Sequence, residues 1–217
     1  MSGIFYALTA LAAVWIWLFP QADLAAILVL VLLPWAALVP VAVSPHLYRF
    51  DDQRNDVRPN LAYAAIMAGL ALAACAMYDV GVLEWPRALA AGALLVALLS
   101  CAQLRCSAAS RGRASVALSL CLINCFYGYG AVALVDSKLD VAARNHYQVE
   151  VLARHSSASY RSRSYYLRLA PWGPRSYPRD VLVRRALYAR LPRGSTACVE
   201  QGAGALGISW YVVSACD

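Results

Sequence analysis

The chain has 217 residues, of which 61% are hydrophobic and only 14% are charged, and its net charge is +7. Soluble domains average about 25% charged residues, whereas here the charges lie almost entirely outside long apolar blocks. This composition excludes an ordinary water-soluble protein and predicts an integral membrane protein.

Five apolar segments are each long enough to cross a bilayer as a helix. They cover residues 3–19, 24–43, 61–78, 88–104 and 114–135. We therefore expect a transmembrane domain over residues 1–135, built as a membrane α-helical bundle of five transmembrane helices. The first segment lacks a basic start and a small-residue cleavage site, so we expect it to be a spanning helix rather than a cleaved signal peptide.

The loops carry the signal for orientation. Basic residues gather in the loop between segments two and three, which holds Arg49, Arg54 and Arg58, and in the loop between segments four and five. Loops rich in Lys and Arg stay in the cytoplasm. We therefore expect a cytoplasmic N-terminus and, after five crossings, a C-terminal domain on the outer side. This assignment depends on the first two segments, because it fails if only one of them spans.

The last third of the chain has a different pattern. Residues 136–144 are expected to extend the fifth helix or to act as a linker, and residues 145–217 alternate between apolar and polar positions. The first run places Val149, Val151 and Ala153 on one face of a strand and Arg154 on the other. Further runs lie at residues 165–169, 181–183, 197–199 and 208–212, with a helical turn at 185–189. Five short strands predict a small all-β domain, an SH3-like or OB-like barrel.

The chain contains seven cysteines. Cys198 and Cys216 are the two that fall in the β-domain, and in an oxidising compartment they could form a disulfide, although two free thiols are the alternative. The other five lie in or beside apolar segments, where Cys behaves as a small hydrophobic residue. Cys/His spacings typical of zinc sites are absent from the sequence, and we expect no metal and no other cofactor.

The sequence offers little catalytic chemistry. The apolar segments hold no ionisable residue between their ends, which argues against a pump or a coupled transporter. Gln103, Asn124 and Tyr127 could line a channel formed by several copies, or could form hydrogen bonds between helices. A polar cytoplasmic loop could bind metal or act in acid–base chemistry, but interleaved Asp and Arg side chains more simply neutralise each other. This loop contains His46, Asp51, Asp52, Arg54, Asp56 and Arg58. We expect no catalytic residue and no enzyme.

Basic and aromatic residues are concentrated in the first hairpin of the β-domain. The candidate binding residues are Arg154, Tyr160, Arg161, Arg163, Tyr165 and Arg168. In the cytoplasm such a mixture would favour nucleic acid, since Arg contacts phosphate and Tyr stacks on bases. On the outer side nucleic acid is not an expected partner. The expected partners are membrane lipids and a protein, either another chain or a second copy, and the hairpin could also lie among lipid headgroups as an anchor.

The β-domain also carries motifs that resemble a known group of proteins. The motifs are Ser164–Leu167, Arg185–Tyr188, Gly194 with Cys198, and Gly204–Tyr211. They are similar to the closing domain of uncharacterised multi-pass inner-membrane proteins of Gram-negative bacteria, over about a third of the chain. The resemblance implies a bacterial inner membrane and a small β-domain, and it carries over no catalytic residue.

These features together favour a binding function. We expect an integral inner-membrane protein that presents a basic periplasmic β-domain, acting as a scaffold or an accessory subunit of a membrane complex. Two alternatives stay open: a membrane immunity or toxin-resistance protein, and a small oligomeric channel or exporter.

Overall fold

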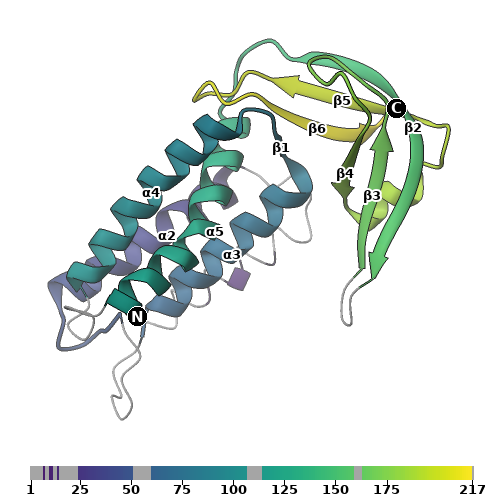
Figure 1. The fold of residues 1–217 in the computed structure, drawn as a ribbon. Helices are drawn as coiled ribbons and strands as arrows, with labels where there is room; N and C mark the ends of the chain where they lie inside the picture. The colour runs from purple at the N-terminus through teal and green to yellow at the C-terminus, as the bar shows by residue number, and fades with distance from the viewer. Residues whose placement is uncertain are drawn as a thin grey trace.

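The computed structural model describes residues 7, 10, 11, 14, 24–50, 60–106, 114–158 and 163–216. Within these residues the chain forms a bundle of helices and one curved sheet that lies over one end of the bundle (Figure 1). The predicted first helix, at residues 3–19, lies almost entirely outside the described residues.

Four of the described helices are long and apolar enough to span a membrane. They are α2 (Leu24–Val43, 20 residues), α3 (Ala62–Asp79, 18 residues), α4 (Trp85–Cys106, 22 residues) and α5 (Ala114–Lys138, 25 residues). A helix needs about 20 residues to cross the hydrocarbon core of a bilayer. Length and composition thus make this a membrane-associated chain, and predicted segments two to five agree with these helices to within three residues at each end.

The central helix of the bundle is α5, which packs against α2, α3 and α4. Two glycines let its neighbours approach closely. A Cβ on Gly130 would collide with Leu72 and Ala73 of α3, and Gly128 lies against Gly92 of α4. Small residues at helix crossings are the common means of close packing in membranes, where no hydrophobic force drives helices together.

The sheet has six antiparallel strands in the order β1-β6-β5-β2-β3-β4. They are β1 (Gly81–Val82), β2 (Asn145–Ala158), β3 (Arg163–Leu169), β4 (Arg179–Val183), β5 (Thr196–Gly202) and β6 (Trp210–Ala215), with helix α6 (Arg185–Arg190) after β4. The five predicted strands and the helical turn are all present. The sheet is an open half-barrel rather than the closed SH3-like or OB-like barrel that we expected (Figure 1). Helix α3 contacts both edge strands, β1 and β4. In a closed barrel these two strands would pair with each other, whereas here the end of the bundle lies between them.

Strand β1 comes from the connection between α3 and α4. Its Gly81 pairs with Tyr211, and Val82 pairs with Trp210. The predicted β-domain of residues 145–217 therefore receives one strand from the predicted transmembrane region, residues 1–135. A strand of two residues has no alternation to detect, and this explains why the sequence did not predict it.

A β-bulge in β2 changes which face its later residues occupy. Val151 pairs with Leu169, but Arg154 pairs with Leu167, because the register shifts between Val151 and Ala153. Paired residues project from the same face, and one extra residue reverses the alternation beyond it. The expectation that Arg154 lies on the polar face was therefore wrong: it shares the inner face with Leu167.

Two hydrophobic clusters hold the molecule together. One fills the helix bundle and continues into the sheet region through Ile208 and Trp210. The other lies on the inner face of the sheet and is centred on Val151, Leu167 and Leu169, each fully buried. Since the first cluster crosses from helices to sheet, the β-domain packs directly on the bundle end.

Candidate binding site

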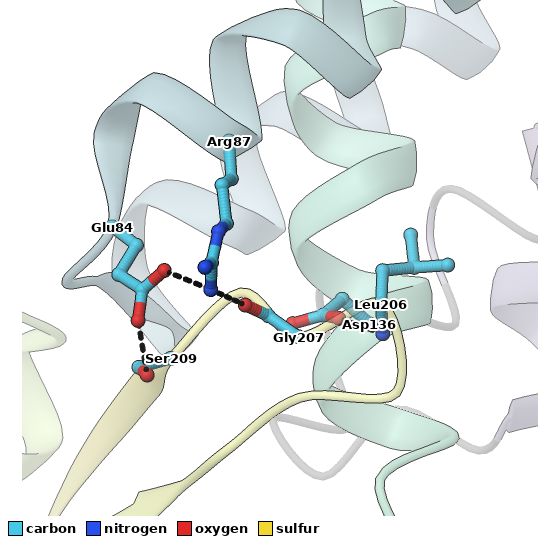
Figure 2. A network of polar contacts seen from close by, with 6 residues as sticks. All are labelled: Glu84, Arg87, Asp136, Leu206, Gly207 and Ser209. Atoms are coloured by element: carbon cyan, nitrogen blue, oxygen red, sulfur yellow. Dashed lines mark hydrogen bonds and ion pairs between the residues drawn. The ribbon is translucent and has the colours of Figure 1, made fainter.

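The β5–β6 loop is fastened to the ends of α4 and α5 by polar contacts that we term the clamp (Figure 2). The clamp comprises Glu84, Arg87, Asp136, Asp140 and residues 203–209. Glu84 accepts hydrogen bonds from the hydroxyl of Ser209 at 2.9 Å and from Arg87 at 2.7 Å. Arg87 also donates to the carbonyl of Gly207 at 2.9 Å. The start of α4 is thus tied to the loop.

Two buried carboxylates make the rest of the clamp. Asp136, at the end of α5, accepts a 2.6 Å hydrogen bond from the N–H of Leu206. Asp140 accepts hydrogen bonds from the N–H of Gly204 at 2.8 Å and from the indole of Trp210 at 2.9 Å. Burial acts to raise the pKa of Asp140, but hydrogen bonds from backbone N–H groups and from Trp210 outweigh it and hold that pKa below its ordinary value of 3.8. Both carboxylates therefore serve to hold the β-domain in place.

A second contact joins the β-domain to α3. The guanidinium of Arg184, between β4 and α6, donates two hydrogen bonds of 2.7 Å to the two carboxylate oxygens of Asp79. This bidentate geometry is the strongest arrangement for an Arg–carboxylate pair. The hydrogen bonds from Arg184 to Asp79 also raise the pKa of Arg184.

Beside this ion pair lies an open cavity of about 250 Å³ between α3 and the β3–β4 edge of the sheet, here termed the basic groove. It is lined by Ala74, Cys75, Tyr78, Arg163, Tyr165, Val183, Arg184 and Arg185. Three guanidinium groups and two phenol rings thus meet at the end of α3, and none of the described lining residues is acidic. Because Arg163 and Arg185 are exposed, the groove suits an anionic ligand that arrives from solvent.

The predicted binding residues do not all meet in this groove. Arg163 and Tyr165 line it. Arg154 instead serves the β-domain itself: it donates a 2.6 Å hydrogen bond to the carbonyl of Tyr188 and lies 4.1 Å from the centre of that ring. Tyr165 packs against the ring of Tyr188, with 4.9 Å between the two ring centres. The position of Arg154 follows from the bulge in β2.

Arg168 lies on the outer face of the sheet. It pairs across the strands with Asp180, which is also 3.9 Å from the imidazole of His155. The structure therefore separates Arg168 from Arg163 and Tyr165. Tyr160 and Arg161 lie outside the described residues.

Arg184 and Arg185 were not predicted to be parts of a binding site. They directly follow the third predicted strand, where the predicted helical turn begins. Two consecutive arginines at this position were the one local feature that could have indicated a binding site. Their role depends on α3, whose Tyr78 completes the groove. Tyr78 and the two arginines are about a hundred positions apart in the sequence. A pattern among neighbouring residues cannot predict that they meet.

Cys198 and Cys216 are joined by a disulfide, with their Cα atoms 5.1 Å apart. Cys198 pairs with Ser214 across β5 and β6, so Cys216 lies just beyond its strand partner. The bond closes the hairpin at the end opposite the clamp loop.

The polar loop proposed for metal or acid–base chemistry is described only in part. His46 is exposed, whereas Asp51, Asp52, Arg54, Asp56 and Arg58 lie outside the described residues. Throughout residues 24–50, 60–106, 114–158 and 163–216, no group of three or more His, Cys, Asp or Glu side chains could hold a metal ion.

The polar residues of the bundle bond to one another within one chain. The amide of Asn124 donates to Gln103 at 2.8 Å and to Ser100 at 2.9 Å. The hydroxyl of Tyr127 donates to a backbone carbonyl of α2 at 2.7 Å and accepts a 2.9 Å hydrogen bond from Trp35. These contacts join helices, in agreement with the interhelical alternative.

Comparison of the chain with protein-family models, with curated proteins and with solved structures finds no match. No residue role is therefore transferred from a relative. The basic groove, at the end of a helix long and apolar enough to span a membrane, is the strongest indication of function.

Proposed function

We propose that this protein is a membrane-anchored binding subunit whose basic groove takes an acidic segment of a partner protein in a membrane complex. The observation that carries the proposal is the convergence of Arg163, Arg184 and Arg185 with Tyr78 and Tyr165 in one groove. Arg and Tyr dominate the energetics of protein interfaces, because they combine large contact areas with directional hydrogen bonds.

The charges of the groove favour an anionic partner. Arg184 is bound to Asp79, whereas the exposed Arg163 and Arg185 stand at the rim. Guanidinium groups beside a low-dielectric membrane attract carboxylates more strongly than the same groups in bulk water. The clamp supports this function because it fixes the β-domain relative to the helices. The protein therefore loses less conformational entropy when the partner binds.

The proposal includes a location in the inner membrane of a bacterium, with the N-terminus in the cytoplasm and the β-domain in the periplasm. The Arg-rich loops support this orientation, and the disulfide between Cys198 and Cys216 supports an oxidising compartment. Fusing alkaline phosphatase after Asp217 tests it, because that enzyme is active only in the periplasm. A fluorescent protein that matures in the cytoplasm at the same position would overturn the orientation.

Partner capture with matched charge variants tests the binding function. We expect R163Q/R185Q to lose a protein that co-purifies with the wild type. The control is R190Q/R193Q, which removes the same charge from two exposed positions that do not line the groove. If both variants keep the partner, or both lose it to the same extent, the basic groove is not the binding site.

The same experiment separates the alternatives. A toxin-immunity role is the case in which the captured protein is a toxin, and identification of the protein decides this. An oligomeric channel would need polar side chains facing a pore, whereas Asn124 and Gln103 bond to each other inside one chain. Ion flux through the reconstituted protein would favour the channel over the binding subunit.

A further inference from the structure

A second cavity lies between the inner face of the sheet and the helix ends, and we term it the arginine pocket. Its volume is about 180 Å³, and its walls come from the end of α3, from β1, β4 and β6, and from Trp85 and Tyr129. Arg175 and Arg179 both line this pocket. It borders the basic groove at Tyr78 and Val183, but neither Arg175 nor Arg179 lines that groove.

The two arginines of the pocket bring like charges together. Burial and the neighbouring Arg179 lower the pKa of Arg175. The buried Nε of Arg175 has no hydrogen-bond partner among the residues that the structure describes. A buried donor without a hydrogen bond destabilises the fold. Repulsion between the positive charges of Arg175 and Arg179 destabilises it further. An anion between Arg175 and Arg179 would satisfy both groups.

A buried phenol adds a donor to this pocket. Tyr211 lines it, and its ring packs over Gly81, where a Cβ would overlap the ring. Burial raises the pKa of Tyr211, while Arg175 and Arg179 act in the opposite direction because both lie close to it. The hydroxyl is therefore protonated at neutral pH and can donate to an anionic oxygen.

The carboxylates at the pocket do not neutralise the two arginines. Asp79 binds Arg184 through both of its oxygens at 2.7 Å. Asp180 follows Arg179 on β4, and successive strand residues point to opposite faces. Its carboxylate accordingly lies near His155 on the outer face, at 3.9 Å. The inner wall of the pocket therefore carries net positive charge.

The arginine pocket shares a wall with an apolar groove. This groove has a volume of about 300 Å³ and follows the line between α4 and α5. Val80, Val82, Trp85 and Tyr129 line both cavities. Small residues, among them Ala97, form much of the rest of the groove wall. Ala97 is exposed on the side of the bundle that lipid chains would surround. Asp136, at the β-domain end of α5, also lines the groove, and its carboxylate belongs to the clamp.

We propose that these two cavities together bind one anionic lipid of the surrounding bilayer. Its phosphate lies between Arg175 and Arg179, and one hydrocarbon chain follows the groove between α4 and α5. A charged pocket that adjoins an apolar groove matches an amphiphile with a negative head. The site lies at the ends of the membrane-spanning helices, where lipid phosphates are found. It does not depend on the basic groove or on the side of the membrane that carries the β-domain.

Lipid retention by the full-length protein tests this site. The purified protein is mixed with micelles that contain phosphatidylglycerol or phosphatidylcholine, and bound lipid is counted by native mass spectrometry. We expect a preference for phosphatidylglycerol that falls about tenfold in R175Q/R179Q, since two charge-assisted contacts are lost. The charge-matched control R190Q/R193Q keeps the preference. The groove variant A97F weakens the binding of both lipids.

Three results would overturn the proposal. The first is an unchanged preference in R175Q/R179Q. The second is an equal loss in R190Q/R193Q, which would indicate general surface charge. The third is complete displacement of phosphatidylglycerol by millimolar inorganic phosphate, which would indicate a site for a free anion. Unfolding temperature and size-exclusion profile confirm that each variant is folded. If the double variant is not, the single R179Q, at an exposed position, is measured against R190Q with the same criteria.

Discussion

The β-domain meets the helices at two places that are built differently. In the clamp, Asp136 and Asp140 are buried, and each accepts hydrogen bonds from the β5–β6 loop. In the basic groove, Arg163 and Arg185 are exposed beside an open cavity. Polar groups that are satisfied inside the protein stabilise a fold, whereas exposed charges in a concave site are available for recognition. Substitutions in the clamp should therefore lower the stability of the protein, whereas substitutions in the basic groove should weaken partner binding and leave stability almost unchanged.

The largest loss of stability is expected for D136A. Asp136 is only 1% exposed, and removal of its carboxylate leaves the N–H of Leu206 without this acceptor. We expect roughly 3–4 kcal/mol of destabilisation, from one lost charge-assisted hydrogen bond and one orphaned donor. Thermal unfolding in detergent measures it. The comparison variant is E84A at the exposed part of the clamp, which should lose less than about 1 kcal/mol; equal unfolding temperatures for the two variants would contradict this difference.

Removal of the disulfide should have the next largest effect. C198S/C216S opens the hairpin that carries the clamp loop. Cross-links that close loops of this length stabilise a protein by roughly 2–3 kcal/mol, mainly by restricting the unfolded chain. The unfolding temperature should fall by the same amount in the variant as in the reduced wild type. A variant as stable as the oxidised wild type would show that the bond contributes nothing.

The ion pair between Arg184 and Asp79 should contribute less, because both side chains are partly exposed. R184K keeps the charge but loses one of two parallel hydrogen bonds. We expect about 1 kcal/mol of destabilisation. A double-mutant cycle with D79N isolates the pair, and a coupling energy near zero would mean that this contact does not hold the β-domain to α3.

Acid should weaken the clamp through Asp140. Because its pKa is lower in the folded protein than its ordinary value of 3.8, the stability that it contributes is complete above that value and is lost as the pH falls through the lower, folded pKa. The wild type should therefore be more stable than D140N at neutral pH, and this advantage should shrink below about pH 4. An advantage that is constant from pH 7 to pH 3 would contradict the assignment.

The smallest change in stability is expected at the basic groove. R163Q/R185Q replaces two exposed side chains, and such surface substitutions usually alter stability by less than about 0.5 kcal/mol. Its unfolding temperature should match that of the wild type even where partner binding is lost. A large drop would mean that the groove is a structural contact like the clamp.

Local patterns predicted much of this fold. Four apolar runs became helices, and five alternating runs became strands, because hydrophobic length and period-two alternation are properties of neighbouring residues. The sequence did not reveal β1, since Gly81 and Val82 become a strand only when β6 lies beside them. For residues 136–144 it left a helix extension and a linker open; α5 does extend to Lys138, but the burial of the Asp136 carboxylate under the β5–β6 loop was not predicted.

The candidate site was predicted only in part, for the same reason. Arg163 and Tyr165 were found because basic and aromatic residues cluster in the first hairpin of the β-domain. Arg154 was misplaced by a bulge that alternation alone cannot show. Arg184 acquires its role from Asp79, a contact across 105 positions of the chain. Tertiary contacts of this kind decide which charges are used inside the fold and which are left for a partner.

Site-specific photo-crosslinking in living cells tests the binding function most directly. A photoreactive amino acid is placed at Ala186, an exposed residue beside Arg185, and in parallel at Ala203, an exposed residue of the clamp loop. The proposed function predicts a discrete protein adduct at Ala186 that disappears in R163Q/R185Q, and no such adduct at Ala203. An adduct at Ala186 that persists in R163Q/R185Q, or identical adducts at both positions, would contradict it.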